Sequence, residues 1–331
     1  MSQTDQQRMQ ALQAWLGSLC GHSFSDIQPA SSDASFRRYF RVNDSVTNKS
    51  FVVMDAPPDK EDCSPFIYIT RLLREAGVNA PAIHQMNQQQ GFLLLDDLGN
   101  RPYLDYLNDD TADELYADAL SAMVNMQHIE QATELPLYDQ QRLQDEMNLF
   151  EAWYLNKHLE IKLDSQQKAS LQHVFNILIQ SAQEQPQVFV HRDYHSRNLM
   201  LLEENNPGVI DYQDAVIGPL TYDLVSLFKD CYVEWPREKV EAWLDSYLVQ
   251  TDLPVDFDRS QFIRWFDLMG VQRHLKVLGI FSRLNYRDGK PQYLNDLPLT
   301  LKYVVDASNR YDELSPLLNL LQETVLQVTE H

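Results

Sequence analysis

The chain has 331 residues, of which 44% are hydrophobic and 23% charged, a composition typical of a globular protein large enough for two lobes. Its formal charge of −21, from 48 acidic and 27 basic side chains, would repel a nucleic-acid backbone or an anionic membrane, so neither is an expected partner. Three scattered cysteines without a CxxC pair, and the lack of a run of about 18 apolar residues, predict a soluble cytoplasmic protein without a disulfide framework, zinc site or membrane span.

The first third of the chain predicts a small β-rich lobe over residues 1–98. Apolar residues at helical spacing in 6–19 indicate an opening helix. The β-prone runs 35–42 and 50–54 flank the turn-forming NDSVTNK and predict an antiparallel hairpin. A helix over 65–76 and a strand over 91–98 follow.

The remainder, residues 99–331, predicts a larger and mainly helical lobe. Helical periodicity covers 109–127, 143–158 and 166–183, and it returns from Val240 onward. Three short apolar runs interrupt it at 188–191, 199–202 and 208–210. The chain therefore predicts a small β-rich lobe followed by a large α-rich one, an α+β architecture.

A polar loop between two of these apolar runs carries the chemistry. In VFVHRDYHSRNLMLL, residues 188–202, Asp193 and Asn198 have the spacing of the protein-kinase catalytic loop, where Asp accepts the proton of the substrate hydroxyl and Asn binds magnesium. Asp211 ends the next apolar run in GVIDYQDA and can supply the second metal ligand. Asp193 is therefore the predicted catalytic base, with Asn198 and Asp211 as predicted metal ligands.

Each of these residues alone is as readily a turn or strand-terminating residue. Their order, with strand, loop, strand and acidic residue in succession, makes the kinase interpretation the favoured one. His191, Arg192 and His195 lie in the same loop, where a histidine either supports the backbone or contacts a ligand.

The segments HRDYHSRNLM, IDYQDA and GPLTYDLVSLFKD resemble the aminoglycoside phosphotransferase and choline kinase superfamily over nearly the whole chain. The resemblance implies a bilobal protein-kinase-like fold with residues 1–98 as the nucleotide-binding lobe, ATP as co-substrate and Mg²⁺ as cofactor. It also implies that Asp223 is structural, and we interpret it as an N-terminal helix cap. Since only about a dozen residues separate Asp211 from Asp223, no activation loop for a peptide is expected.

Within this superfamily, SSDASFRRYFRV, VMDAPPDKED, DYQDAVIGP and LFKDCYVEWP are most similar to bacterial anomeric amino-sugar kinases. That resemblance implies phosphorylation of the C1 hydroxyl of N-acetylmuramate and N-acetylglucosamine in peptidoglycan recycling. Two alternatives stay open: a kinase of an aminoglycoside, choline or another hydroxylated metabolite, and a nucleotide-binding pseudokinase.

The predicted nucleotide-binding segments depart from the sequence pattern of protein kinases in two places. Residues 29–41 contain no glycine, so Ser31, Ser32 and Ser35 are expected to donate to phosphate instead. The strand FVVMDAP lacks the usual lysine, and Arg37 or Arg38 either replaces its charge or faces solvent. Adenine is expected at the segment LLLDDLG, where the backbone of Asp97 or a neighbour would bind it.

Residues 267–287 contain a stripe of basic side chains that could bind the acceptor sugar. Arg273, Lys276, Arg283 and Arg287 recur at helical intervals opposite leucines and valines, either as a solvated face or as a border of the cleft. On the second interpretation, Arg273 or Arg283 would bind the lactyl carboxylate of N-acetylmuramate. His195 is the third predicted substrate contact.

Overall fold

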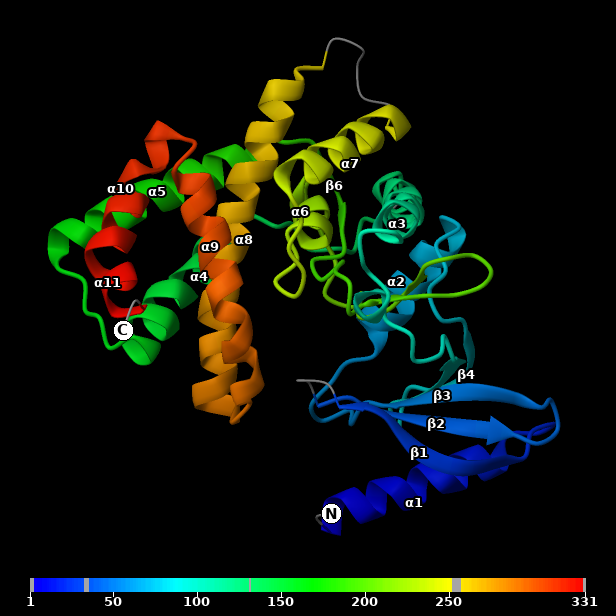
Figure 1. Cartoon of the computed structure of the whole chain (residues 1–331). Coiled ribbons are helices and arrows are strands. Elements are labelled where there is room, and N and C mark those ends of the chain that lie inside the picture. Colours follow the sequence, from blue (N-terminus) through cyan, green and yellow to red (C-terminus); the bar gives the residue numbers. More distant parts are fainter. Residues whose placement is uncertain (1–2, 33–35, 131, 252–256, 330–331) are drawn as a thin grey trace. The chain divides into compact units, whose positions relative to one another are not determined.

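The computed structural model describes residues 3–32, 36–130, 132–251 and 257–329. The chain forms two compact units, and Figure 1 colours them along the sequence. The first contains Met1–Arg101 and Met200–Gln213, and the second contains Pro102–Leu199 and Asp214–His331. The short segment Met200–Gln213 therefore belongs to the first unit although both of its flanks belong to the second.

The first unit is built on a five-stranded antiparallel sheet with the strand order β1-β2-β3-β5-β4. Its elements are α1 (Gln3–Ser18), β1 (Phe24–Ser32), β2 (Arg38–Asp44), β3 (Lys49–Asp55), α2 (Ser64–Glu75), β4 (Ile83–Asn87), β5 (Phe92–Asp96) and β8 (Gly208–Val209). The strand β8 pairs with β7 (Leu199–Met200) in a separate two-stranded sheet. The predicted hairpin is confirmed as β2 and β3, with Val42 opposite Phe51.

The helix α1 covers one face of this sheet, as Figure 1 shows. Side chains alternate between the two faces of a strand, so residues two apart share a face. The residues that pack together here are Leu12, Trp15 and Leu16 of α1 with Phe40, Val42, Phe51, Val53, Phe92 and Leu94 of the strands. Their burial gives the small unit a hydrophobic core of its own.

The segment Met200–Gln213 is fixed within the first unit by specific contacts. The buried ring of Tyr212 stacks on Phe66 of α2, with centroids 5.0 Å apart, and its hydroxyl lies 2.8 Å from the hydroxyl of Thr70. At the start of the segment, Leu201 N donates to Arg101 O at 2.7 Å. Tyr212, the residue after Asp211, is thus part of the first unit's core.

The second unit is mainly helical. Its elements are α3 (Ala112–Gln127), α4 (Gln140–Leu149), the π-helix η2 (Phe150–His158), α5 (Ser165–Gln183), β6 (Gln187–Val190), β9 (Val216–Pro219), α6 (Tyr222–Phe228), α7 (Arg237–Gln250), α8 (Arg259–Asp288), α9 (Leu297–Ser308), α10 (Ser315–Leu320), η5 (Leu321–Val325, π-helical) and α11 (Leu326–Thr329), with short 3₁₀ turns η1 (Tyr103–Asp105), η3 (Pro291–Asp296) and η4 (Asp312–Leu314). The strands β6 and β9 pair antiparallel, and the polar loop with Asp193 and Asn198 lies between them in the sequence.

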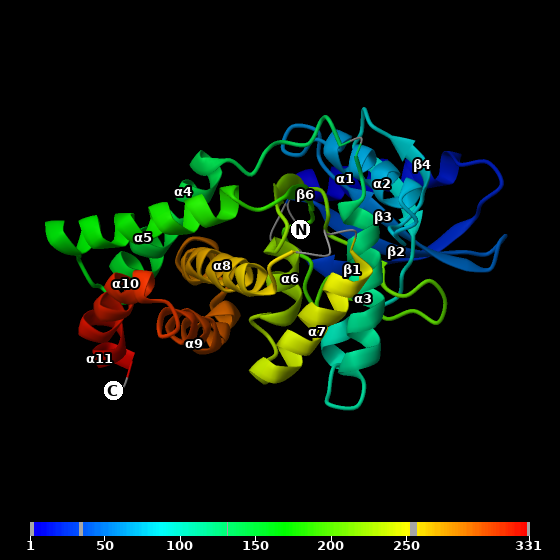
Figure 2. The same cartoon turned by 90° about the horizontal axis from the view of Figure 1, so that it is seen from above.

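The 30-residue helix α8 is the centre of the second unit. It packs against α4, α5, α6 and α9, and Figure 2 shows it between α5 and α6 with α9 alongside. Gly279 permits the closest of these approaches, because a Cβ atom there would lie 2.4 Å from the backbone carbonyl carbon of Leu149. At Gly270 the nearest atom to such a Cβ would be 3.7 Å away, which is ordinary contact.

The α+β architecture is as predicted, with a sheet-based first unit and a helical second unit. The strands β1, β4 and β9 were not predicted. The sequence of β1, FSDIQPASS, has few β-branched or aromatic residues, and this strand lies at an edge of the sheet, where pairing with one neighbour is sufficient. Among the described residues, no helix has the length and apolar character needed to cross a membrane.

Candidate active site

The predicted catalytic loop follows β6 and is closed on itself by hydrogen bonds. His195 N donates to Asp193 O at 3.0 Å, and Asn198 N donates to His195 O at 2.9 Å. The side-chain Nδ2 of Asn198 donates to the same Asp193 oxygen at 3.0 Å. Asp193, His195 and Asn198 therefore belong to one compact turn.

Two buried carboxylates hold this turn from the following segment. Asp223 accepts hydrogen bonds from His191 N at 2.7 Å and Arg192 N at 3.0 Å. Asp230 accepts from Ser196 N at 3.0 Å and from the Ser196 hydroxyl. Our interpretation of Asp223 as a helix cap is wrong, since it lies in the first turn of α6 but its oxygens bind the loop. The contribution of Asp230 was not predicted.

Asp193 is the most exposed carboxylate of this cluster, with 40% of its side chain accessible. The guanidinium Nη2 of Arg273, which is almost fully buried, lies 3.9 Å from Asp193 Oδ1. Burial alone would raise the pKa of Asp193, but the positive charges of Lys276 and Arg273 and the neighbouring His195 lower it to about 2. Asp193 is thus ionised at neutral pH and accessible to a ligand.

A buried charge network supports this arrangement. Glu146 on α4 accepts from Arg192 Nη2 at 2.5 Å and lies 3.2 Å from Lys276 Nζ, which also donates to the hydroxyl of Tyr222 at 2.9 Å. Burial would raise the pKa of Glu146, but Lys276 and Arg192 lower it below its ordinary value. For Lys276 the two effects have opposite signs from those on Glu146. Burial lowers the pKa of Lys276, and the charge of Glu146 raises it above the ordinary value. Both groups therefore stay charged.

The predicted basic stripe on α8 does not form a solvated face. Arg273 and Lys276 are buried, and Arg273 Nε donates to Ser226 Oγ at 2.7 Å. The interpretation as a solvated face is therefore wrong for Arg273 and Lys276. Helical spacing alone does not show that carboxylates distant in the sequence neutralise the charges of these two residues. Arg283 is half-buried, and its Nε has no hydrogen-bond partner among the described residues. It lies about 15 Å further along the helix axis than Arg273, given the rise of 1.5 Å per residue.

His195 presents a buried nitrogen beside the candidate base. Its Nδ1 is buried without a hydrogen-bond partner among the described residues, and its ring packs edge-on against Tyr232 with centroids 5.6 Å apart. Burial lowers the pKa of His195, while Asp230 and Asp193 oppose that shift. The ring is therefore neutral at pH 7 and offers one donor and one acceptor.

The predicted metal ligands offer oxygen atoms, the donors that Mg²⁺ prefers. Asn198 donates through its amide nitrogen within the loop, and its side chain also carries an amide oxygen, an atom type that Mg²⁺ accepts as a ligand. Asp211, in the first unit, has φ 67°, and its Oδ1 accepts from Gln213 Nε2 at 2.8 Å. A left-handed backbone is uncommon for residues other than Gly, although Asp tolerates it better than most. Within the described ranges, no group of three or more His, Cys, Asp or Glu side chains could hold a metal, so an ion here would need phosphate oxygens and water as further ligands.

The predicted nucleotide contacts lie in the first unit. Ser31 and Ser32 end β1, Ser35 lies outside the described residues, and Arg37 precedes β2. Asp97 follows β5, where its carboxylate accepts from Arg41 Nε at 2.6 Å and from Arg41 Nη2 at 2.8 Å. The side chain of Asp97 thus forms an ion pair with Arg41, and any contact of Asp97 with adenine would use its backbone.

The position of the missing lysine is occupied by a buried ion pair. Asp55, at the end of β3, is fully buried and accepts hydrogen bonds from both Arg8 and Arg38. Arg38 Nη1 also lies 3.2 Å from Asp5 Oδ1. The interpretation of Arg38 as a solvent-facing residue is therefore wrong, since it binds two carboxylates.

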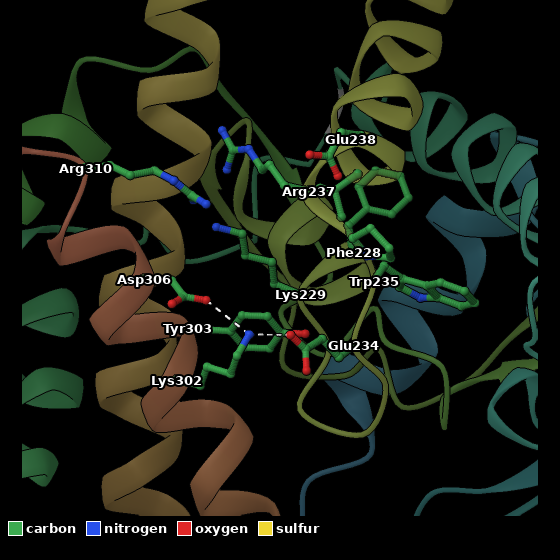
Figure 3. A pocket seen from close by; sticks show the side chains of 12 residues that line it. Phe228, Lys229, Glu234, Trp235, Arg237, Glu238, Lys302, Tyr303, Asp306 and Arg310 are labelled. Carbon is green, nitrogen blue, oxygen red and sulfur yellow. Dashed lines mark hydrogen bonds and ion pairs between the residues drawn. The ribbon is translucent and has the colours of Figure 1, made fainter. Parts of the chain in front are cut away.

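A separate cavity of about 330 Å³ lies in the second unit, and Figure 3 shows its lining. It includes Lys302 between Glu234 and Asp306, and also Lys229 and Arg237. Lys229 Nζ and Arg237 Nη1 both bind Asp267 Oδ1, at 2.8 and 2.6 Å. These charges neutralise one another, and no residue of the catalytic loop lines the cavity.

Comparisons with known proteins identify the family of the chain. Residues 26–263 match the family model described as the phosphotransferase enzyme family. The chain is 47% identical to N-acetylmuramate/N-acetylglucosamine kinases of Pseudomonas putida, with 96% of both chains covered, and of Pseudomonas aeruginosa, with 96% of this chain and 97% of the relative covered. An ethanolamine kinase of Plasmodium vivax has the same fold, with a TM-score of 0.61 at 12% identity over 86% of this chain and 82% of that one. Because the family model covers more than half of the chain and the relatives match nearly all of it, the chain belongs to the phosphotransferase enzyme family and is an enzyme that transfers phosphate to a hydroxyl group.

Proposed function

We propose that this enzyme transfers the γ-phosphoryl group of ATP to the anomeric C1 hydroxyl of N-acetylmuramate and N-acetylglucosamine, giving the sugar 1-phosphates in peptidoglycan recycling. The observation that carries the proposal is the accessible and ionised carboxylate of Asp193 in a turn shared with Asn198. The two relatives that are 47% identical bear the names of these sugars.

In the proposed reaction, Asp193 accepts a hydrogen bond from the C1 hydroxyl and orients its oxygen toward the γ-phosphorus. The bond between that oxygen and phosphorus forms as the bond from the γ-phosphorus to the β,γ-bridging oxygen breaks. The hydroxyl proton passes to Asp193 and then to water, and ADP leaves with the electron pair of the broken bond. Arg273 and Lys276 keep Asp193 ionised before the transfer.

The weakly basic carboxylate of Asp193 is sufficient for an anomeric hydroxyl. A carboxylate of this kind is a weak base, and it suits a hydroxyl that loses its proton easily. A hemiacetal hydroxyl at C1 is more acidic than the other hydroxyl groups of a sugar. In a loose transition state the proton leaves late, so positioning by Asp193 contributes more than basicity.

Apart from Asn198, which belongs to the second unit, the proposed nucleotide contacts belong to the first unit. Asn198 and Asp211 would hold Mg²⁺, which when bound neutralises charge on the phosphates. Ser31, Ser32 and Ser35 would donate to phosphate, and the backbone near Asp97 would bind adenine. Arg37 or Arg38 would supply the charge of the absent lysine, and the pairing of Arg38 with Asp55 positions its guanidinium.

A substrate screen with a blocked acceptor tests the proposal. The enzyme is incubated with ATP, magnesium and, separately, N-acetylmuramate, N-acetylglucosamine, choline, an aminoglycoside and the methyl glycoside of N-acetylglucosamine. We expect phosphorus NMR to show an anomeric phosphate with the two free sugars and no product with the methyl glycoside, whose C1 oxygen is capped. Turnover of the methyl glycoside, or of choline or the aminoglycoside alone, would contradict the assignment.

Replacing Asp193 by asparagine should lower kcat by about 10²- to 10⁴-fold, because the side chain keeps its size but can no longer accept the proton. ATP affinity should change little, since the carboxylate faces the acceptor. Steady-state kinetics and nucleotide titration measure the two quantities. An Asp193→Asn enzyme with the kcat of the parent would exclude Asp193 as the base.

A further inference from the structure

Arg197 differs from most arginines of this chain in how its charge is used. Arg41, Arg192, Arg237 and Arg259 each form an ion pair with a carboxylate. Arg197 is exposed, and its guanidinium forms no hydrogen bond or ion pair with a described residue. In a protein with 48 acidic side chains, an arginine without such a partner beside the catalytic turn is available for a ligand.

The guanidinium of Arg197 is nevertheless held in place. Its central carbon lies 3.5 Å from the centroid of the Tyr232 ring, so the cation stacks on the aromatic face. The ring itself is fixed by the edge of His195 and by Phe281, whose centroid lies 6.5 Å away. Stacking occupies the face of a guanidinium and leaves the N–H groups along its edge to donate in the ring plane.

Arg197 belongs to the same turn as Asp193, the proposed catalytic base. The two residues are four apart in a turn closed by the hydrogen bonds of His195 and Asn198, and all of these residues belong to the second unit. The half-buried aromatic rings of Tyr232 and Tyr293, with Phe281 between them, form a surface of the kind against which a sugar ring packs.

We infer that Arg197, stacked on Tyr232, binds the carboxylate of the acid sugar and so determines the preference for N-acetylmuramate over N-acetylglucosamine. This inference rests on the proposed function. The lactyl carboxylate is attached at C3, two carbons from the reacting C1, and it is the group that N-acetylglucosamine lacks. The edge of the guanidinium matches a carboxylate with two parallel hydrogen bonds.

The structure favours Arg197 over the arginines predicted from the stripe. Arg273 is buried and bonded to Ser226, and Arg287 pairs with Asp288 at 2.8 Å. Arg283 lies about 15 Å further along α8 than Arg273. Burial raises the pKa of Asp296, and the charge of Arg197 opposes that shift without an ion pair between these two described side chains.

The test compares three acceptors: N-acetylmuramate, its neutral methyl ester and N-acetylglucosamine. For Arg197→Ala we expect kcat/KM for the acid to fall by roughly 10- to 100-fold and for the two neutral acceptors by less than about threefold. Arg197→Lys keeps the charge without the planar fork and should give an intermediate loss. The matched control is Arg71→Ala, which removes an exposed arginine stacked on Tyr68 at 5.4 Å in the first unit, and it should leave all three values unchanged.

Equal losses for all three acceptors in Arg197→Ala, or no loss, would overturn the inference. A rise in the KM for ATP that is the same with each sugar would also overturn it, because Arg197 would then bind the nucleotide. If the parent enzyme phosphorylates neither sugar, the proposed function fails with it. If the parent phosphorylates both and Arg197→Ala does not discriminate, only the role of Arg197 is wrong.

Discussion

Lys276 acts on Asp193 by charge, and its effect can be measured without turnover. Among the charges that lower the pKa of Asp193 against burial, that of Lys276 is the largest. In Lys276→Met the pKa of Asp193 should therefore rise, and the acid limb of kcat/KM should move to higher pH. Carbon NMR of the Asp193 carboxyl group between pH 4 and 8 should detect the onset of titration in this variant and none in the parent.

A structural effect alone would lower activity at every pH and leave that titration unchanged. Lys276→Arg restores the charge beside Glu146 and should return the acid limb to that of the parent. If the pH profile of Lys276→Met has the shape of the parent profile, the charge of Lys276 does not control Asp193.

Asp211 is expected to act on the metal rather than on the acceptor. Asp211→Ala should weaken the binding of ATP in the presence of magnesium by about tenfold or more, since it removes a charged oxygen ligand. ATP binding with the metal chelated should be almost unchanged. Calorimetric titrations with and without magnesium measure both values, and equal losses in the two would show that Asp211 supports the fold and not the ion.

At the scale of elements, two glycines of α8 should respond to the same substitution with opposite sign. Gly279→Ala places a methyl group 2.4 Å from the backbone of Leu149, and overpacking of this kind costs about 1 to 3 kcal/mol. Gly270→Ala meets atoms only at 3.7 Å or more, so the helix propensity of alanine should stabilise the protein by about 0.5 to 1 kcal/mol. Urea unfolding of the two variants measures the difference, and similar free energies of unfolding would show that α8 and α4 do not pack as closely as described.

Helices, strands and loops that depend on local sequence signals could be predicted from the sequence, whereas contacts between distant residues could not. The helices α2 and α5 and the β2–β3 hairpin follow from local capping, turn and periodicity signals, which depend on residues close together in the chain. The loop with Asp193 and Asn198 is predictable for the same reason. The burial of Arg273 and Lys276 is not, since it depends on Glu146 and Tyr222 in other helices. Arg197 was overlooked because its distinguishing contact, the ring of Tyr232, lies 35 positions later in the printed sequence.

At the scale of the whole molecule, the first unit should not fold from residues 1–101 alone. That fragment lacks Tyr212, which fills a space against Phe66, and β8 with it. The loss of a large buried aromatic ring costs about 3 to 5 kcal/mol, a large part of the stability of a small unit. We expect broad, poorly dispersed amide NMR signals from the fragment.

A second polypeptide provides the control. Arg101 O and Leu201 N are 2.7 Å apart, so a short Gly-Ser linker can join residue 101 to residue 200. Residues 1–101 linked to 200–213 should give dispersed signals and a cooperative unfolding transition. If the fragment that ends at residue 101 unfolds as cooperatively as the linked one, the segment 200–213 is not needed for the first unit.

The return of residues 200–213 to the first unit also sets an order of events during synthesis on the ribosome. The amino-terminal sheet emerges early, yet Phe66 and Thr70 receive their partner Tyr212 only after the intervening helices of the second unit have been translated. At ordinary elongation rates this delay is roughly 5 to 20 s, long compared with the folding time of most small domains. During that interval the nascent chain exposes the apolar surface of α2 that Tyr212 later covers, which makes it a site where a chaperone can bind.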